Sequence, residues 1–345
     1  MYKNRKNHLA RIITLGIAVT IFVTSCIRNS LISEISLIPE PSIGNGIYRI
    51  KGDDLTGNLI WSPNGQYLAG LNSVGPNPDF CFLGCEESYF EIYIIDLENK
   101  QRQTILRTKY SEKDILNIFW FPDGLHIGYT TLNDLEHGGE TWSIDIQGQN
   151  DIQVLSEIEN PVWSPDNTKK ALDAFEKFGN DWYSVIYVVD ALTNQKDQVF
   201  IANEPYVHLR GLSWSLDGKI LAFSYGDTRS DVTELRPKIF FVELETNKIT
   251  QFTINKFEEF THPEFSPKYN LIAYERYQPA FNKRTVVIED LNAKCEIQLP
   301  NEFNSLASWS PDGQKLTVGD IGKYYVVDLL EFIGPKFKET GSICT

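Results

Sequence analysis

Short apolar segments alternate with polar turns along most of the chain, and no long stretch keeps a helical period. The clearest unit is Trp309-Ser310-Pro311-Asp312-Gly313, which is followed by the apolar segment Lys315–Val318. Proline fixes φ for the second position of a type I turn, aspartate tolerates the third, and glycine accepts the positive φ that follows. The pattern therefore predicts a buried strand that ends at Trp309, a tight hairpin turn and a second strand.

Five relatives of this unit occur upstream, at intervals of about 40 to 60 residues, as in propellers and solenoids. They occupy residues 61–65, 120–124, 163–167, 214–218 and 265–269. After each second strand comes a third strand that ends on an acidic residue, and then a more polar fourth strand. The acidic residues are Asp96, Asp145, Asp190, Glu243, Asp290 and Asp328. Four antiparallel strands per repeat and six repeats predict an all-β, six-bladed β-propeller.

Several copies depart from the motif. Phe121 replaces serine, Leu216 replaces proline, and Asn167 stands where glycine is usual. Asparagine tolerates the left-handed conformation, but Tyr269 at the same place in the fifth copy adopts it only at a cost. Blade 5 is therefore expected to turn differently.

The sixth repeat has no clear fourth strand after Asp328. Ile47–Ile50 precedes the first repeat by the distance that a fourth strand would need. We therefore predict that Ile47–Ile50 is the outer strand of the last blade, so that the two ends of the chain close the ring together.

The first residues look like a targeting segment. Basic residues precede the apolar run Ile12–Val23, which is too short for the roughly 20 residues that span a bilayer. The run ends in Val23-Thr24-Ser25-Cys26, which resembles the lipobox of bacterial lipoproteins. The resemblance implies a signal peptide over residues 1–25, a lipidated Cys26 that anchors the protein to a bacterial membrane, and a body in the periplasm or outside the cell. An ordinary signal with an incidental cysteine is the alternative.

The domain organisation follows from these segments. Residues 26–45 are expected to form a lipid-anchored tether, and residues 46–345 a propeller with a short C-terminal tail. The chain has a formal charge of −14, and residues 1–25 contain basic but no acidic residues, so the body is more acidic still. This charge argues against nucleic acid as a partner and against membrane contact other than through Cys26. We expect a monomer.

Four cysteines remain besides Cys26, an even number that suits disulfides in an exported protein. Cys81 and Cys85 share one loop, so their local pairing is the simplest arrangement. Cys295 would then bind the tail at Cys344. A metal site is the weaker alternative, because paired C-x-x-C spacing is absent.

The repeated aromatic-Ser-Pro-Asp-Gly turn with its Ile-Tyr-apolar-apolar-Asp third strand resembles the TolB-type β-propeller, which also occurs in prolyl oligopeptidases. The resemblance covers roughly residues 46–330. It implies a six-bladed ring that serves as an interaction platform. The motif tryptophans are then expected to pack between blades, and the repeated aspartates to cap turns rather than bind calcium.

Catalytic motifs are lacking: the sequence has no G-x-S-x-G, H-E-x-x-H or glycine-rich phosphate loop, and no cofactor or metal is expected. The more informative residues lie in the loops that enter each innermost strand and in those that join strands two and three. Together they could form a basic and aromatic patch that binds a peptide carboxylate or an anionic sugar. The ligand-binding candidates are His208, Arg210, Arg229, His262, Arg276 and Tyr277.

Two functions remain open. The first is a non-enzymatic scaffold that binds an envelope protein or peptide. The second is a carbohydrate-active enzyme or sugar-binding propeller that uses channel-facing groups such as His208, His262 and Glu264.

Overall fold

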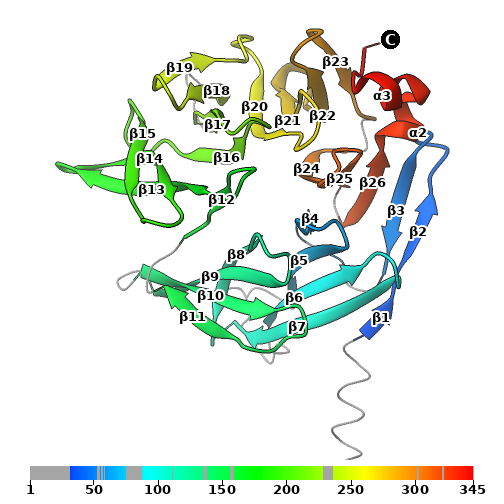
Figure 1. Ribbon diagram of the computed structural model, residues 1–345, viewed down its shortest axis with the longest axis horizontal. Helices are drawn as coiled ribbons and strands as arrows, with labels where there is room; N and C mark the ends of the chain where they lie inside the picture. The colour runs from blue at the N-terminus through cyan, green and yellow to red at the C-terminus, as the bar shows by residue number, and fades with distance from the viewer. Residues whose placement is uncertain are drawn as a thin grey trace, which may run out of the picture.

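The computed structural model describes residues 32–52, 55, 57, 59–74, 88–110, 112–134, 138–155, 159–227, 236–300, 303–320 and 322–344. Their strands form six antiparallel sheets, which stand around a common axis as the blades of a propeller (Figure 1). The predicted fold class is therefore confirmed.

Each blade contains four strands, and blades 1 and 6 each have a fifth strand at the outer edge. From the axis outward, blade 1 consists of β4 (Leu59–Trp61), β5 (Tyr67–Val74), β6 (Tyr89–Asp96), β7 (Gln101–Lys109) and β1 (Ile32–Glu34). Blade 2 consists of β8 (Asp114–Trp120), β9 (His126–Asp134), β10 (Gly138–Asp145) and β11 (Ile152–Leu155). Blade 3 consists of β12 (Val162–Trp163), β13 (Lys169–Phe178), β14 (Asp181–Asp190) and β15 (Lys196–Ile201).

The other three blades follow the same order. Blade 4 consists of β16 (Leu209–Trp214), β17 (Ile220–Tyr225), β18 (Lys238–Glu243) and β19 (Lys248–Gln251). Blade 5 consists of β20 (Glu259–Phe265), β21 (Leu271–Gln278), β22 (Lys283–Asp290) and β23 (Cys295–Gln298), with the short 3-10 helix η3 (Pro279–Phe281) between β21 and β22. Blade 6 consists of β24 (Ser305–Trp309), β25 (Lys315–Asp320), β26 (Lys323–Asp328), β3 (Ile47–Lys51) and β2 (Ser36–Pro39).

The motif turns are held by their own polar side chains. In blade 6, the Ser310 hydroxyl donates to Asp312 at 2.6 Å, and Asp312 accepts the N–H of Gln314 at 3.0 Å. The same serine bond recurs in the pairs Ser62–Asn64, Ser164–Asp166 and Ser215–Asp217. The acidic residues that end the third strands also cap turns, as where Asp96 accepts the N–H groups of Glu98 and Asn99. These aspartates are therefore structural.

The fifth turn differs, as expected. Asn167 takes the left-handed conformation at φ 58°, whereas Tyr269 does not adopt a positive φ. The Tyr269 ring instead packs against Phe337 of helix α3 (Pro335–Thr340), with 4.9 Å between the ring centroids. Blade 5 thus uses its turn to hold the C-terminal tail.

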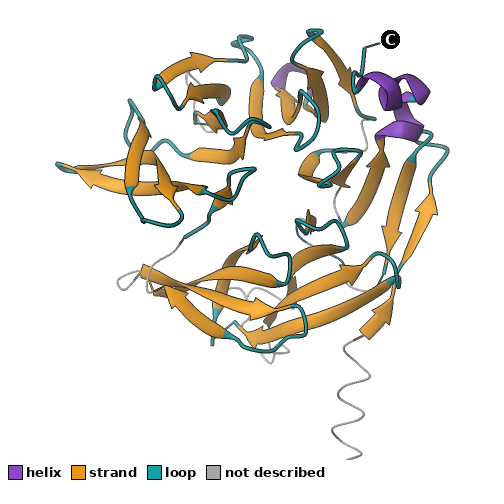
Figure 2. Ribbon diagram, viewed as in Figure 1, coloured by secondary structure: helices purple, strands orange, loops and turns teal. Residues whose placement is uncertain are grey.

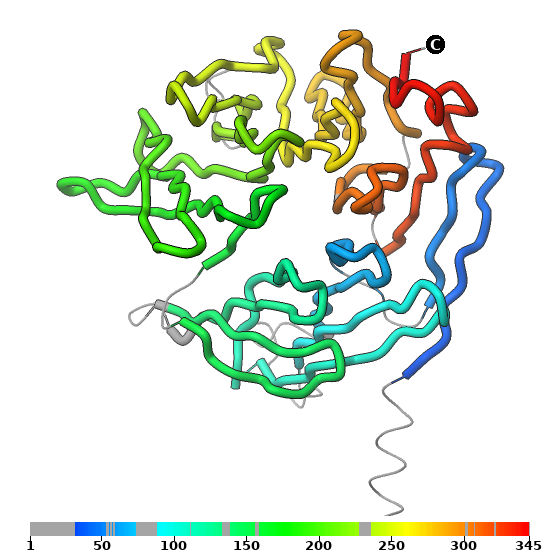
Figure 3. The backbone as a smooth tube through the Cα atoms, viewed as in Figure 1, coloured from blue at the N-terminus to red at the C-terminus, as the bar shows by residue number. Residues whose placement is uncertain are grey.

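The two ends of the chain meet in blade 6. Strand β3 pairs with β26, with Ile47 opposite Val327 and Ile50 opposite Tyr324, and the blue and red segments run side by side in Figure 3. Strand β2 adds outside β3, and β1 adds to the outer edge of blade 1. The segment expected as a tether over residues 26–45 therefore belongs to the blades from Ile32 onward, because the outer edges of two sheets offer it unpaired backbone groups.

The tail beyond β26 forms helix α2 (Leu329–Ile333) and helix α3, which lie beside blade 6 in Figure 2. Phe337 is fully buried there. Cys344 forms a disulfide with Cys295 of β23, across a Cα–Cα distance of 6.1 Å. This confirms the expected pairing of Cys295 with Cys344. Cys26, Cys81 and Cys85 lie outside the described residues.

Apolar clusters fill most of the seams between neighbouring blades, and motif tryptophans take part in them as expected. The indole N–H of a tryptophan in one blade donates to a carbonyl in the inner strand of the preceding blade. These bonds join Trp120 to Ile60 at 3.2 Å, Trp214 to Val162 at 2.8 Å and Trp309 to Glu264 at 3.1 Å. These three bonds join the inner strands in pairs, blade 1 with blade 2, blade 3 with blade 4 and blade 5 with blade 6.

Candidate functional site

Antiparallel strand order places two kinds of connection on the same end of the propeller. The loop between the second and third strand of a blade and the link from its fourth strand to the next blade both lie there. We call this end the connection face. Most of the candidates chosen from the sequence belong to these connections or to the strand ends beside them.

The most distinctive feature of the connection face is a group of exposed rings on blade 3, which we call the aromatic cluster. It consists of Phe175, Trp182, Tyr206 and His208. Phe175 stacks on Trp182, with centroids 5.8 Å apart and planes 10° apart, and on His208, with centroids 5.3 Å apart and planes 24° apart. Tyr206 meets Phe175 edge-on at 6.4 Å. The exposed fractions are 38% for Phe175, 40% for Trp182 and 48% for Tyr206.

The length of one hairpin explains why these rings are exposed. Strands β13 and β14 have ten residues each, and Phe175 and Trp182 share the side of the sheet on which Ile186 packs against blade 4. Because the hairpin continues beyond the buried part of that seam, the rings near its end are left uncovered. The left side of Figure 1 shows this hairpin.

The link from blade 3 to blade 4 brings the other two rings to the same place. The N–H of Tyr206 donates to the Trp182 carbonyl at 2.8 Å, and the Ser184 hydroxyl donates to the Val207 carbonyl at 2.7 Å. Tyr206 has a φ of 61°, a strained value for a bulky residue. The link is thus held against β14 in a conformation that presents Tyr206 and His208 beside Phe175.

His262 lies on the inner strand of blade 5 and forms a second, separate site. Its backbone is left-handed at φ 50°, and it packs against Gly211 of blade 4, the neighbour of the exposed Arg210. The His262 Nδ1 atom is 3.2 Å from a carboxylate oxygen of Glu275. When Nδ1 carries the proton of this bond, Nε2 keeps a lone pair and can accept a proton.

Glu275 is buried and joins three elements. It accepts hydrogen bonds from the Thr261 hydroxyl and, in the next blade, from the N–H of Leu306 at 3.0 Å. Burial alone would raise the pKa of Glu275, but the hydrogen bonds from His262, Leu306 and Thr261 hold it below its usual range. The carboxylate is therefore ionised and orients the imidazole.

Glu264 lies two residues after His262 on the same strand. Burial raises the pKa of its carboxyl group to about 8, because the surrounding protein disfavours the charged form. A carboxylic acid that stays protonated near neutral pH is a feature of many functional sites, although structural groups show it too.

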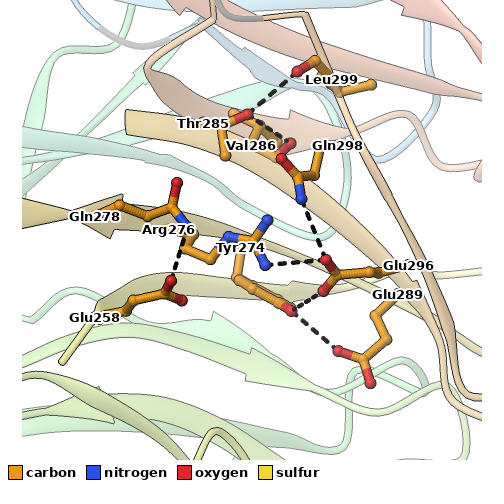
Figure 4. Close-up of polar contacts among 10 residues, drawn as sticks. All are labelled: Glu258, Tyr274, Arg276, Gln278, Thr285, Val286, Glu289, Glu296, Gln298 and Leu299. Atoms are coloured by element: carbon orange, nitrogen blue, oxygen red, sulfur yellow. Dashed lines mark hydrogen bonds and ion pairs between the residues drawn. The ribbon is translucent and has the colours of Figure 1, made fainter. Parts of the chain in front are cut away.

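Arg276 and Tyr277 point to opposite sides of β21. Figure 4 shows Arg276 paired with Glu296 at 2.9 Å, close to the Tyr274 phenol, which donates to Glu289 at 3.0 Å. Arg276 is buried and neutralised in this network. The Tyr277 hydroxyl donates to Asn282 at 3.0 Å, and Arg284 lies over the Tyr277 ring.

The structure therefore brings the candidates together only in part. His262 and Arg210 lie on neighbouring inner strands, whereas the His208 ring stacks on Phe175 of blade 3 from the link to blade 4, and Arg276 belongs to a network inside blade 5. Arg229 lies outside the described residues. The sequence reasoning missed Phe175, Trp182 and Tyr206 as partners of His208. The one available signal was the unusual length of the hairpin that contains the first two.

Within the residues that the structure describes, no group of histidine, cysteine, aspartate and glutamate side chains has the arrangement of a metal site. In the same part of the chain, no helix has both the length and the apolar character of a membrane span.

No protein-family model and no curated protein matches the chain. Solved structures do resemble it. TolB from Acinetobacter baumannii is 18% identical with a TM-score of 0.52, and the match covers 76% of this chain and 64% of that protein. A protein described as a putative TolB from Agrobacterium tumefaciens is 17% identical with a TM-score of 0.52, over 83% of this chain and 98% of the other.

Enzymes share the same fold. An oligogalacturonate lyase from Vibrio parahaemolyticus is 12% identical with a TM-score of 0.52, and the match covers 86% of this chain and 97% of the lyase. The chain spans less than two thirds of the Acinetobacter TolB. At these identities the likeness shows the fold, a TolB-like six-bladed β-propeller, and leaves the chemistry to the residues of the site.

Proposed function

We propose that the protein is an exported, lipid-anchored propeller that binds a protein or peptide partner through the aromatic cluster of blade 3. The observation that carries this proposal is the exposure of Phe175, Trp182 and Tyr206 side by side on a rigid hairpin and its adjoining link. Scattered apolar residues are common on surfaces, but a contiguous group of large rings is typical of an interaction site. Tryptophan and tyrosine are also the residues that contribute most to the binding energy of interfaces.

The architecture supports a binding role. The cluster is fixed by the backbone bonds of the link and by the paired strands of the hairpin, so little backbone entropy is lost when a partner docks. A rigid ring of blades that presents variable connections is a suitable platform for recognition.

Export and lipid anchoring rest on sequence features. The basic residues, the short apolar run and Cys26 have the order of a lipoprotein signal. The Cys295–Cys344 disulfide is compatible with an oxidising compartment outside the cytoplasm. Incorporation of labelled palmitate into the wild-type protein but not into Cys26→Ser would support the anchor, and equal incorporation would contradict it.

Site-specific photo-crosslinking in intact envelopes tests the binding function. A photoreactive phenylalanine analogue at position 182 should give a discrete crosslinked partner. The same analogue at Phe257, which is 63% exposed in the link from blade 4 to blade 5, should not. The crosslink should weaken when Phe175 is changed to Ala. Equal crosslinking from both positions, or none from position 182, would contradict a specific site at the cluster.

Carbohydrate chemistry at the inner strands is a second candidate function. The observation in its favour is the oriented His262–Glu275 pair two residues from Glu264, whose pKa of about 8 suits a proton donor. Because one protein of the same fold is an oligogalacturonate lyase, oligogalacturonate is the first substrate to test. Turnover that is lost in both His262→Ala and Glu264→Gln would support this function, and turnover that neither substitution alters would place the activity elsewhere.

A further inference from the structure

The geometry of the aromatic cluster leaves ring faces available. Phe175 and Trp182 are nearly parallel, but their centroids are 5.8 Å apart, so the rings are offset and cannot cover each other. The contact of Phe175 with His208 is offset in the same way. The negative face of such a ring attracts a cation, most strongly for tryptophan.

Carboxylates surround these rings. Asp173 lies two residues before Phe175 on the same side of β13, where the surrounding protein disfavours the charged form and raises the pKa of its carboxyl group. Asp181 precedes Trp182. Glu204 is exposed in the link two residues before Tyr206. The Tyr206 hydroxyl lies 3.5 Å from an Asp181 oxygen, which places that carboxylate at the edge of the cluster. The structure shows no ion pair of any of these three acids with another described residue.

Two exposed cations lie near the cluster, Lys177 in the hairpin and Arg210 two residues after His208, and the structure shows no ion pair of either with the three acids. Lys177 stands opposite Trp182 in the hairpin. It is the one basic residue between Phe175 and Ser184, the end of the hairpin that contains the exposed rings. Lys196 lies on the other side of the blade, where it covers the Tyr187 ring at 3.7 Å. Acidic residues thus outnumber basic ones near the cluster by one, and the whole chain is acidic, with a formal charge of −14.

We propose that the aromatic cluster binds a basic segment of a partner protein, whose lysine or arginine side chains lie against Trp182 and Phe175 and pair with Asp181 and Glu204. This inference rests on the proposed binding function and adds the charge of the partner. Arginine suits such a site best, because its planar guanidinium stacks on a ring while it donates hydrogen bonds to a carboxylate.

A membrane surface is the competing occupant, since exposed tryptophan and tyrosine also favour the lipid interface. Two observations favour a protein. The carboxylates and the acidic body repel the anionic headgroups that would otherwise hold such a surface. In addition, the proposed lipid anchor precedes β1, the first described strand, and β1 is at the outer edge of blade 1 (Figure 1). The cluster is on blade 3, so it does not lie beside the strand that follows the anchor.

Short labelled peptides of equal length test the charge of the partner. The first peptide contains arginine residues separated by glycine and serine. The second peptide has leucine in place of each arginine, and the third has glutamate in place of each arginine. We expect fluorescence anisotropy to show preferential binding of the arginine peptide by the mature wild-type protein. Trp182→Ala should weaken it about fivefold, the loss of roughly one cation–π contact. Asp181→Asn should weaken it at low salt and have little effect at high salt.

Controls separate this inference from the proposed function. Phe257→Ala removes a more exposed ring elsewhere and should leave the affinity unchanged. Thermal melting should show that Trp182→Ala is folded. Equal or tighter binding of the leucine or glutamate peptide, no binding of any peptide, or arginine binding that Trp182→Ala does not alter would overturn the inference. Binding to zwitterionic or anionic vesicles that depends on Trp182 would overturn it in favour of a membrane. In each of these cases a specific protein crosslink from position 182 would still uphold the proposed function.

Discussion

The seam between blades 5 and 6 contains a large apolar cluster and is covalently reinforced, while the seam between blades 2 and 3 lacks such a cluster and is incompletely bonded. In the first, Ala273, Val286, Leu306 and Trp309 belong to one buried cluster that continues into the C-terminal tail. The Trp309 indole donates to the Glu264 carbonyl, and the Cys295–Cys344 disulfide holds the tail to blade 5. Packing, a hydrogen bond and a covalent bond all act at the same seam.

Blade 2 turns a different surface toward blade 3. Ile127 and Tyr129 pack toward blade 1, so Gly128 and Thr130, which alternate with them, face the other way. No cluster of buried apolar side chains joins the two blades among the residues described. A hydrogen bond is found there, in which the Thr141 hydroxyl accepts the N–H of Glu159 at 2.9 Å.

Buried polar atoms are also left without partners at this seam. They include Thr130 Oγ1, Asn160 Oδ1 and Trp163 Nε1. The same indole nitrogen of Trp120, Trp214 and Trp309 donates to a carbonyl of the preceding blade. An unpaired buried polar atom costs about 1–3 kcal/mol. The comparison teaches that the shared motif specifies a blade and its turn, whereas the strength of a seam depends on residues outside the motif. The ring is therefore expected to be weakest between blades 2 and 3.

The largest contrast should come from truncating the motif tryptophan at each seam. Trp309→Ala removes a buried ring and its hydrogen bond, so the free energy of unfolding should fall by about 3–5 kcal/mol. Trp163→Ala should cost less, because Trp163 is only partly buried and makes no indole bond. Denaturant unfolding of both variants measures the difference, and equal losses would show that the two seams are equally strong.

The disulfide should contribute the next largest effect. Cys344→Ser opens a covalent loop with a sequence separation of 49 and should lower the free energy of unfolding by about 2–4 kcal/mol. Addition of a reductant to the wild-type protein should reproduce the loss. If the serine variant melted at the wild-type temperature, the disulfide would add nothing to the stability of the seam between blades 5 and 6.

The Glu264 carboxyl predicts how that seam responds to pH. Its folded-state pKa of about 8 lies above the value of 4.5 usual for glutamate, so between these values the folded state holds a proton that the unfolded state has lost. Stability should therefore fall as pH rises from about 5 to 8, by an amount on the order of 1–3 kcal/mol. Glu264→Gln should remove this dependence. A variant with the same pH profile as the wild type would contradict the raised pKa.

Local physics explains how much of the fold was predictable from the sequence. Each motif turn is specified by side chains within a few residues, such as Ser310 and Asp312, and six copies in order indicate the number of blades. Even the departures followed this logic: Asn167 took the left-handed position and Tyr269 did not. Strands β1 and β2 were missed because their pairing depends on which distant sheet edges are free.

The candidate site was less predictable because it depends on register and on what remains uncovered. Arg276 looked like a binding residue until the pairing of β22 with β23 placed Glu296 beside it. His208 was identified, but its neighbours Phe175 and Trp182 read as ordinary strand residues. Only the depth of the seam between blades 3 and 4 decides that these rings are exposed.

The smallest expected effect isolates the indole hydrogen bond. Trp309→Phe keeps an aromatic ring but loses the bond to Glu264, and it leaves that carbonyl without its donor. Trp163→Phe loses a similar volume, yet removes an N–H group that has no partner. The first variant should therefore be less stable than the second by about 1 kcal/mol. Because both substitutions shrink the ring alike, this difference reports the bond itself, and its absence would mean that Trp163 finds a partner in solution.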